Sequence, residues 1–99
     1  MTLRWLKAAI ADLDEIFDYI TEDDAQAAAR VLERIEGAVN ALKHHPELGR
    51  SGRVAGTREF VVAGLPYLVV YRTSRSHNIE ILAVRHAARR WPRSFAWEQ

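Results

Sequence analysis

After a short alternating run at residues 2–7, the apolar residues of this 99-residue chain change their spacing once, near Pro46. Before this proline they recur every three or four residues, as in amphipathic helices. After it, runs rich in valine, tyrosine and threonine are separated by turn residues, as in strands. A chain of this length forms one domain with one modest core. We therefore expect helices from the first half to cover a sheet built from the second.

The first half predicts a short strand over residues 2–7 and then two helices. Asp23 and Asp24 are N-cap candidates for the second helix, which must end before Pro46 because proline breaks the helical hydrogen-bond pattern. A short link between two helices implies an antiparallel hairpin. The first helix has acidic residues on one face and, on the other, an apolar stripe of Ile10, Leu13, Ile16, Phe17 and Ile20.

The second half begins with a loop over residues 46–53, rich in proline and glycine. Three strands are then predicted, over 57–63, 67–73 and 79–85. The order β-α-α-β-β-β predicts an α+β fold, with the N-terminal helical hairpin packed on one face of a small, mainly antiparallel sheet. We expect one domain over residues 1–99, in which the tail 93–99 is free to move.

Several classes of protein are excluded by residues that the chain lacks. It contains no cysteine, which excludes disulfides, thiol nucleophiles and zinc sites with cysteine ligands. The longest apolar run, 61–71, falls well short of the roughly 20 residues that span a bilayer. Residues after the N-terminus become acidic at once, unlike a signal peptide. Phosphate-loop, zinc-protease and serine-hydrolase motifs are missing. We expect a cytoplasmic protein with no cofactor, no metal and no membrane role.

The net charge of +1 is divided unevenly along the chain. Residues 1–49 hold 5 Lys or Arg against 10 Asp or Glu, whereas residues 50–99 hold 9 Arg against 3 Glu. Every basic residue after Lys43 is arginine, which favours planar contacts to phosphate or carboxylate groups. Solvation of the outer face of a sheet explains the same pattern equally well.

Four residues at strand positions suggest phosphate chemistry: Arg58, Arg72, Arg85 and His86. Arginines can neutralise a scissile phosphate while a histidine transfers a proton, as RNA cleavage requires. Strand alternation allows Arg58 and His86 to share one face. The alternative is that His86, at the end of a strand, is a hydrogen-bonded structural residue.

The C-terminal segment interleaves arginines with aromatic residues, including Arg89, Arg90 and Trp91. Such a mixture can stack on bases and contact phosphates. Packing of Trp91 on the edge of the sheet is the alternative.

The stretches WLKAAIADLDEIFDYI, HPELGR, GTREFVVAGLPYLVVYR and IEILAVRHAARRWP together resemble the RelE/ParE superfamily of bacterial toxins. The resemblance covers residues 1 to about 92. It implies a small cytoplasmic toxin that is neutralised by an antitoxin encoded beside it. RelE-like members cut messenger RNA in the ribosomal A site, whereas ParE-like members inhibit DNA gyrase.

The resemblance implies roles for particular residues. Arg58 matches the arginine of the family's Thr-Arg-Glu motif, and His86 falls near a histidine used by some of the ribonucleases. Ribonuclease members also rely on later lysines or a C-terminal tyrosine, but no lysine follows Lys43 and no tyrosine follows Tyr71. The ParE branch is therefore the better match, which implies gyrase inhibition without catalysis. The target contacts would be Arg58, Arg72, Arg85, His86, Arg89, Arg90 and Trp91.

A RelE-like ribonuclease remains the alternative, with Arg58, Arg72 and His86 as its catalytic residues. Under either alternative the resemblance implies a ParD-like antitoxin in a hetero-oligomer with the toxin. The broad stripe on the first helix exceeds what a small sheet needs, so Ile10, Leu13, Ile16, Phe17 and Ile20 are the expected antitoxin contacts. The alternative is that the stripe faces only the sheet and the second helix. An exposed edge strand at 57–63 would also favour addition of a partner strand.

Overall fold

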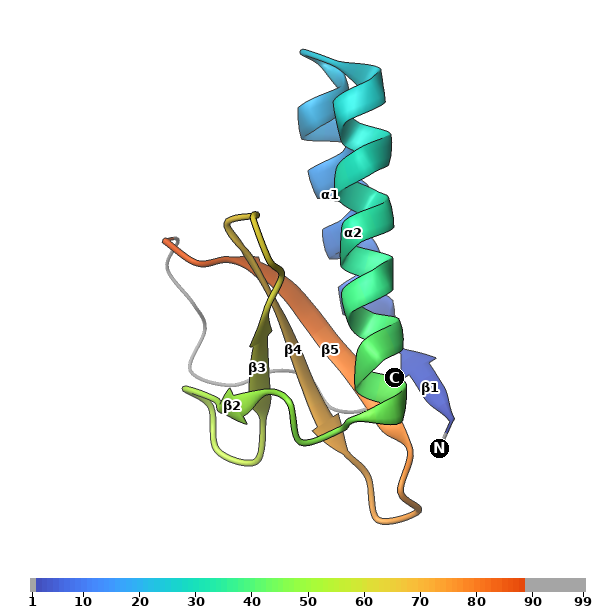
Figure 1. Ribbon diagram of the computed structural model, residues 1–99, viewed down its shortest axis with the longest axis vertical. Helices are drawn as coiled ribbons and strands as arrows, with labels where there is room; N and C mark the ends of the chain where they lie inside the picture. Colours follow the sequence, from blue (N-terminus) through green and yellow to red (C-terminus); the bar gives the residue numbers. More distant parts are fainter. Residues whose placement is uncertain (1, 89–99) are drawn as a thin grey trace.

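The computed structural model describes residues 2–88 and shows a helical hairpin on one face of a sheet (Figure 1). In chain order the elements are β1 (Leu3–Trp5), α1 (Lys7–Thr21), α2 (Ala25–His44), β2 (Arg50–Ser51), β3 (Arg58–Val61), β4 (Tyr67–Thr73) and β5 (Ile79–His86). The strand order across the sheet is β1-β5-β4-β3-β2. Only β1 and β5 are parallel, so the predicted α+β fold with a mainly antiparallel sheet is confirmed.

The structure adds one short strand to the predicted order of elements, because β2 lies inside the stretch expected to be a loop. Its two residues pair with Glu59 and Arg58 of β3. A strand of this length has no periodicity that a sequence pattern can reveal. β3 is therefore not the outermost strand, and it is shorter than the predicted 57–63.

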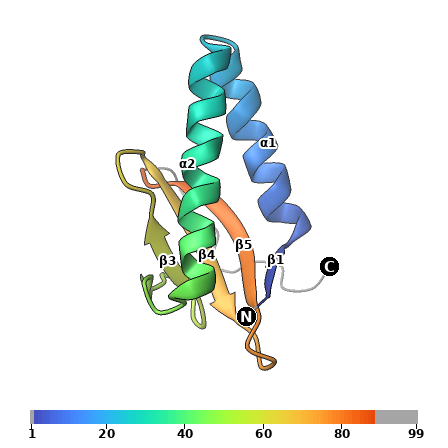
Figure 2. The same cartoon turned by 45° about the vertical axis from the view of Figure 1, so that its right-hand side comes forward.

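The two helices begin and end where local chemistry requires it. Asp24 caps α2, since its Oδ1 accepts hydrogen bonds from the amides of Gln26 at 3.0 Å and Ala27 at 3.2 Å. α2 ends at His44, two residues before Pro46. The hairpin extends beyond the sheet at its closed end, as Figure 2 shows. Neither helix in residues 2–88 is long and apolar enough to cross a membrane.

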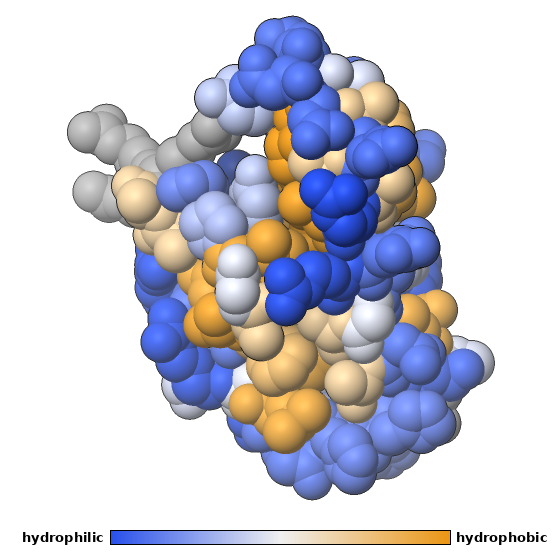
Figure 3. Space-filling model, turned by 45° about the horizontal axis from the view of Figure 1, so that its top comes forward, coloured by the Kyte–Doolittle hydropathy of each residue, from blue (hydrophilic) through white to orange (hydrophobic). Residues whose placement is uncertain are grey.

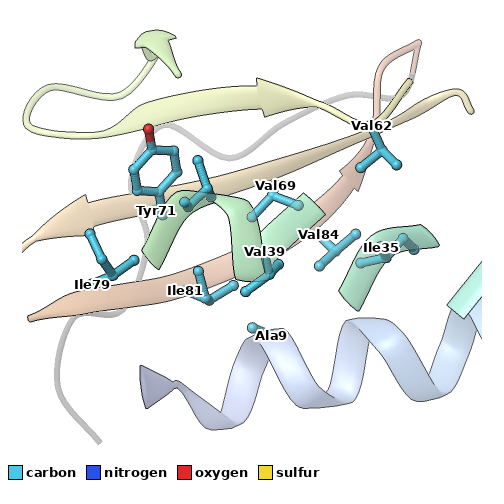
Figure 4. Packing of buried hydrophobic residues seen from close by; sticks show 10 residues of the cluster. Ala9, Ile35, Val39, Val62, Val69, Tyr71, Ile79, Ile81 and Val84 are labelled. Carbon is cyan, nitrogen blue, oxygen red and sulfur yellow. The ribbon is translucent and has the colours of Figure 1, made fainter. Parts of the chain in front are cut away.

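The main core lies between α2 and the two central strands (Figure 4). Ile35, Val39 and Leu42 of α2 are fully buried, and they recur at helical spacing. Opposite them lie Val69, Tyr71, Ile79, Ile81 and Val84 from β4 and β5. α1 contributes one fully buried residue, Ala9, so its apolar stripe packs less deeply than that of α2.

The other face of the central strands is buried as well. Side chains alternate between faces along a strand, so Leu68 and Val70 point away from the helices. Both are at most 2% exposed, and Val70 joins a second cluster with Leu6, Leu82 and Ala83. A register shift beside Val70 lets two neighbouring residues of β5, Leu82 and Ala83, join this cluster.

Candidate functional site

Arg58 ties β3 to the turn that follows α2. Its Nη1 donates hydrogen bonds to the carbonyl oxygens of Gly49 at 2.6 Å and Glu47 at 3.4 Å. Tyr71, its register partner on β4, donates to the carbonyl of Pro46 at 2.6 Å. The same hydroxyl accepts from the amide of Gly49 at 2.8 Å. Arg58 and Tyr71 together fix the turn onto the sheet, which assigns Arg58 a structural role.

The Tyr71 ring leaves no room for a side chain at Gly49. A Cβ atom there would lie 2.6 Å from the Tyr71 hydroxyl and 2.7 Å from a ring carbon. Burial raises the pKa of Tyr71 above its ordinary value, while the hydrogen bond from Gly49 and the charge of Arg58 oppose this shift. The neutral phenol is therefore the form that holds this junction.

His86 lies at the other end of the sheet from Arg58. It is the register partner of Tyr67, whereas Arg58 is the register partner of Tyr71. Four residues along β4 separate the two positions by about 13 Å. The rings of His86 and Tyr67 meet edge to face at 5.6 Å, and Nδ1 of His86 accepts from the amide of Ala88 at 3.2 Å. Arg58 and His86 share the helix-facing side of the sheet but do not form one site.

Arg72 and Arg85 lie on the opposite face of the sheet, because their register partners are Glu80 and Leu68. Arg72 forms an ion pair with Glu80 at 2.6 Å, and Arg4 approaches the same carboxylate at 3.9 Å. The four predicted strand residues are therefore divided between two faces. The structure does not assemble them into the catalytic group that RNA cleavage would need.

A second acidic residue on this face, Glu59, is buried beneath two arginines. Its side chain is 1% exposed, yet it contacts Arg50 at 3.3 Å and Arg53 at 3.7 Å. The amide of Arg53 also donates to it at 2.7 Å. Two carboxylates thus hold four of the five arginines on what we call the arginine face: Arg4, Arg50, Arg53, Arg72 and Arg85. The surplus of positive charge suits contact with an anionic partner.

Sequence reasoning missed Arg4, Arg50 and Arg53 as members of this face. Arg4 precedes the helices by sequence but joins the face because β1 pairs in parallel with β5. Arg50 and Arg53 reach it only through β2 and the turn after it. Alternation along β3 predicts on which face of the sheet Glu59 lies, but no sequence pattern identifies the arginines that pair with it.

A pocket of about 290 Å³ lies between α1 and the ends of β4 and β5. It is lined by Asp12, Glu15, Ile16, Tyr19, Tyr67, Val84, Arg85 and His86. Its acidic and tyrosine residues were not among the sequence candidates. The spacing of Asp12, Glu15 and Tyr19 by three and four residues indicates that they share one helix face. It does not predict which strand end completes the pocket.

Asp12 joins α1 to the free edge of β5 beside this pocket. Its Oδ2 accepts from the amide of Val84 at 2.9 Å, beyond Ile81, where the pairing with β1 stops. Burial raises the pKa of Asp12 above 3.8, and the nearby Glu15 charge adds to the shift. The hydrogen bond from Val84 and the charge of Arg85 oppose it. The helix carboxylate thus replaces a neighbouring strand at this edge.

A second hollow, of about 260 Å³, lies between α2 and the upper part of β3. Its lining is mainly apolar: Arg34, Ala38, Ala41, Phe60, Val61, Val62 and Ala63. β2 pairs only with the first two residues of β3, so within residues 2–88 no strand covers the outer edge of Phe60 and Val61. Val61 is 49% exposed. Figure 3 shows one face of the molecule, on which hydrophobic surface is exposed among hydrophilic residues.

The apolar stripe of α1 is divided between the core and the surface. Leu13 and Ile16 pack against the main core cluster, and Ile20 is partly buried. Ile10 and Phe17 remain 47% and 37% exposed. The part of the stripe that is open to a partner is therefore centred on these two side chains.

Some of the predicted residues and features lie beyond this description. Arg89, Arg90, Trp91 and the tail 93–99 fall outside the described residues. Within residues 2–88, no three His, Asp or Glu side chains are grouped so that they could hold a metal ion.

Solved structures place this fold among bacterial toxins. A chain of the chromosomal ParDE toxin-antitoxin system from P. aeruginosa matches with a TM-score of 0.77 and 28% identity, over 87% of this chain and 95% of that one. A chain of the RelBE2 toxin-antitoxin complex from Mycobacterium tuberculosis matches with a TM-score of 0.58 and 26% identity, over 86% and 95%. The class defined by the fold is thus the toxin of a type II toxin-antitoxin system.

Sequence relatives narrow this class to a family. The family model described as the ParE toxin of the type II toxin-antitoxin system parDE matches residues 3–91. Putative toxin Y4kP of Sinorhizobium fredii is 51% identical over 90 residues, which are 91% of this chain and 92% of the relative. Toxin RelE2 of Caulobacter vibrioides is 39% identical over 85 residues, or 86% and 93%. The chain belongs to the ParE toxin family, within the RelE/ParE superfamily.

Proposed function

We propose that this toxin inhibits DNA gyrase in the cytoplasm and is neutralised by a ParD-like antitoxin. The separation of Arg58 from His86 is the observation that carries the proposal, since residues 2–88 contain no assembled set for RNA cleavage. Arg58 is also engaged with the main chain of the turn after α2. The match to the ParE family model and to the ParDE structure supports the same branch. An inhibitor of this kind acts through surface complementarity.

The arginine face supplies the proposed target contacts, among them Arg72 and Arg85. His86 ends β5 on the helix-facing side of the sheet, and it is a proposed target contact together with Arg89, Arg90 and Trp91, which follow it in the sequence. Arg58 acts indirectly, because it fixes the turn after α2, and Arg50 begins β2 directly after this turn. Aromatic and arginine anchors commonly dominate the energetics of protein interfaces, which fits this composition.

Purified toxin, added to relaxed plasmid, ATP and gyrase, is expected to abolish supercoiling at a small molar excess over the enzyme. Addition of the neighbouring antitoxin restores supercoiling. The double change Arg72→Ala with Arg85→Ala is expected to weaken inhibition at least about tenfold, as loss of two interface anchors would. Arg75→Ala, in the turn between β4 and β5, is the matched control. Full supercoiling at a large excess of folded toxin would contradict the proposal.

A RelE-like ribonuclease is the second candidate, favoured by the similarity to RelE2 and to the RelBE2 structure. In that case, primer extension on translated messages would show cuts in the ribosomal A site. These cuts would disappear with Arg58→Ala, Arg72→Ala or His86→Ala, the residues with proposed catalytic roles. Gyrase inhibition without such cuts separates the two functions in one pair of assays.

We place the antitoxin on the exposed part of the α1 stripe, at Ile10 and Phe17. Both solved relatives come from toxin-antitoxin systems, which supports a partner of this kind. Ile20 extends this surface, while Leu13 and Ile16 support it from the core side. The exposed edge of β3 at Phe60 and Val61 offers a second position, where an extended segment could add as a strand.

Phe17→Ser is expected to weaken antitoxin binding about three- to sixfold, because full burial of a phenylalanine contributes about 1.5–3 kcal/mol and only the exposed 37% of Phe17 is left to bury. Calorimetric titration of the toxin with antitoxin measures the change. Leu48→Ser is the matched control, since Leu48 is also apolar and is 49% exposed, but lies in the turn after α2. Equal affinities for the Phe17→Ser and Leu48→Ser variants would exclude α1 as the antitoxin surface.

A further inference from the structure

The pocket between α1 and the ends of β4 and β5 has a composition that the proposed function does not explain. Asp12, Glu15 and Tyr19 recur at three- and four-residue spacing, so they lie on one face of α1. Tyr67 and His86 form the opposite wall, with their rings edge to face. The lining therefore combines carboxylates with flat aromatic surfaces in one hollow of about 290 Å³.

The charges in the lining favour a cation. Two carboxylates, Asp12 and Glu15, face one guanidinium, that of Arg85. Arg85 balances only one of these negative charges, and like charges three residues apart on a helix destabilise one another. A phosphate or another anion would meet both carboxylates and is disfavoured. Within residues 2–88 there is also no group of three ligands that would hold a metal ion.

The shape of the pocket narrows the choice among cations. Its volume of about 290 Å³ lies just below the range of about 300–1,000 Å³ that is usual for small-molecule sites. It therefore suits one long side chain better than a nucleotide. A guanidinium is planar, stacks on aromatic rings and can form two parallel hydrogen bonds to a carboxylate. The tyrosines and carboxylates of this lining match each of these properties.

We propose that this pocket binds an arginine side chain of a partner polypeptide, with Glu15 and Asp12 as its anionic contacts and Tyr19 and Tyr67 as its walls. This site shares Arg85 with the arginine face, but it does not include the exposed pair Ile10 and Phe17. It does not depend on whether gyrase or the ribosome is the target.

N-acetyl-arginine amide, titrated into the full-length toxin and followed by amide chemical shifts in NMR, tests this proposal. The expected dissociation constant is on the order of 1–10 mM, as for a ligand of this size with few contacts. Shifts should concentrate at Glu15, Ile16 and Val84. N-acetyl-citrulline amide has nearly the same shape without the charge, and it should bind at least about tenfold more weakly. Equal binding of the two compounds would overturn the proposal.

Three charge-removing variants locate the site. Glu15→Gln is expected to weaken binding of the arginine compound about three- to fivefold, the range for loss of one partly exposed ion pair. Asp14→Asn removes a charge from the same helix outside the lining and should leave binding unchanged. Asp12→Asn removes the charge of the second carboxylate. It retains an oxygen that can accept from the amide of Val84, so the fold is kept while this charge is tested. If Glu15→Gln and Asp14→Asn bind the compound equally well, the proposed pocket is wrong.

Discussion

Tyr71→Ala is expected to lower the free energy of unfolding by about 3–5 kcal/mol, the usual cost of removing a buried aromatic side chain. Tyr71 is fully buried in the main core. Its hydroxyl also joins Pro46 and Gly49 to the sheet. Tyr71→Phe removes only these two hydrogen bonds and leaves a buried amide without its partner. This smaller change should cost about 1–3 kcal/mol.

Urea unfolding of the unchanged protein, Tyr71→Ala and Tyr71→Phe separates the contribution of ring packing from that of the hydroxyl hydrogen bonds. Tyr19→Phe is the matched control, because Tyr19 is 64% exposed and its stability change should stay within about 0.5 kcal/mol. If Tyr71→Phe is as stable as Tyr19→Phe, the hydroxyl does not hold the turn in solution.

Glu59→Ala is expected to destabilise the protein by about 2–3 kcal/mol. The change removes a buried carboxylate and leaves the amide of Arg53 without its acceptor. Arg50 and Arg53 lose their shared partner but remain in water, since their side chains are 63% and 44% exposed. The cost is therefore smaller than for an ion pair whose two members are both buried.

Removal of either arginine provides the comparison for this prediction. Arg50→Ala and Arg53→Ala should each cost less than about 1 kcal/mol, as for surface ion pairs. Glu59→Gln, which can still accept from the amide of Arg53, should fall between these values and that of Glu59→Ala. Equal unfolding free energies for Glu59→Ala and Arg50→Ala would show that the buried carboxylate contributes no more to stability than a surface arginine does.

The helical hairpin followed from short-range signals in the sequence. Asp24 was identified as a possible cap because a side-chain oxygen can accept from amides in the first turn. Pro46 set the limit of α2 because proline cannot continue a helix. Such constraints act over a few residues, so one sequence is enough to detect them.

The site depended on contacts between residues far apart in the chain. Alternation along strands assigned Arg58 and His86 to one face, but only the register with β4 showed that they lie at opposite ends. Asp12 meets Val84 because α1 crosses the edge of β5 beyond β1. No local pattern contains these distances.

By itself, the sequence determined the class of fold, the positions of the helices and main strands, and the toxin family. Periodicity, caps and helix breakers act locally, and together they restrict the possible arrangements to very few. The tertiary structure decided that Arg58 supports the turn after α2, that β2 pairs with β3, and that α1 completes a pocket with β5. These features depend on strand register and helix packing, which are fixed only when the whole core forms.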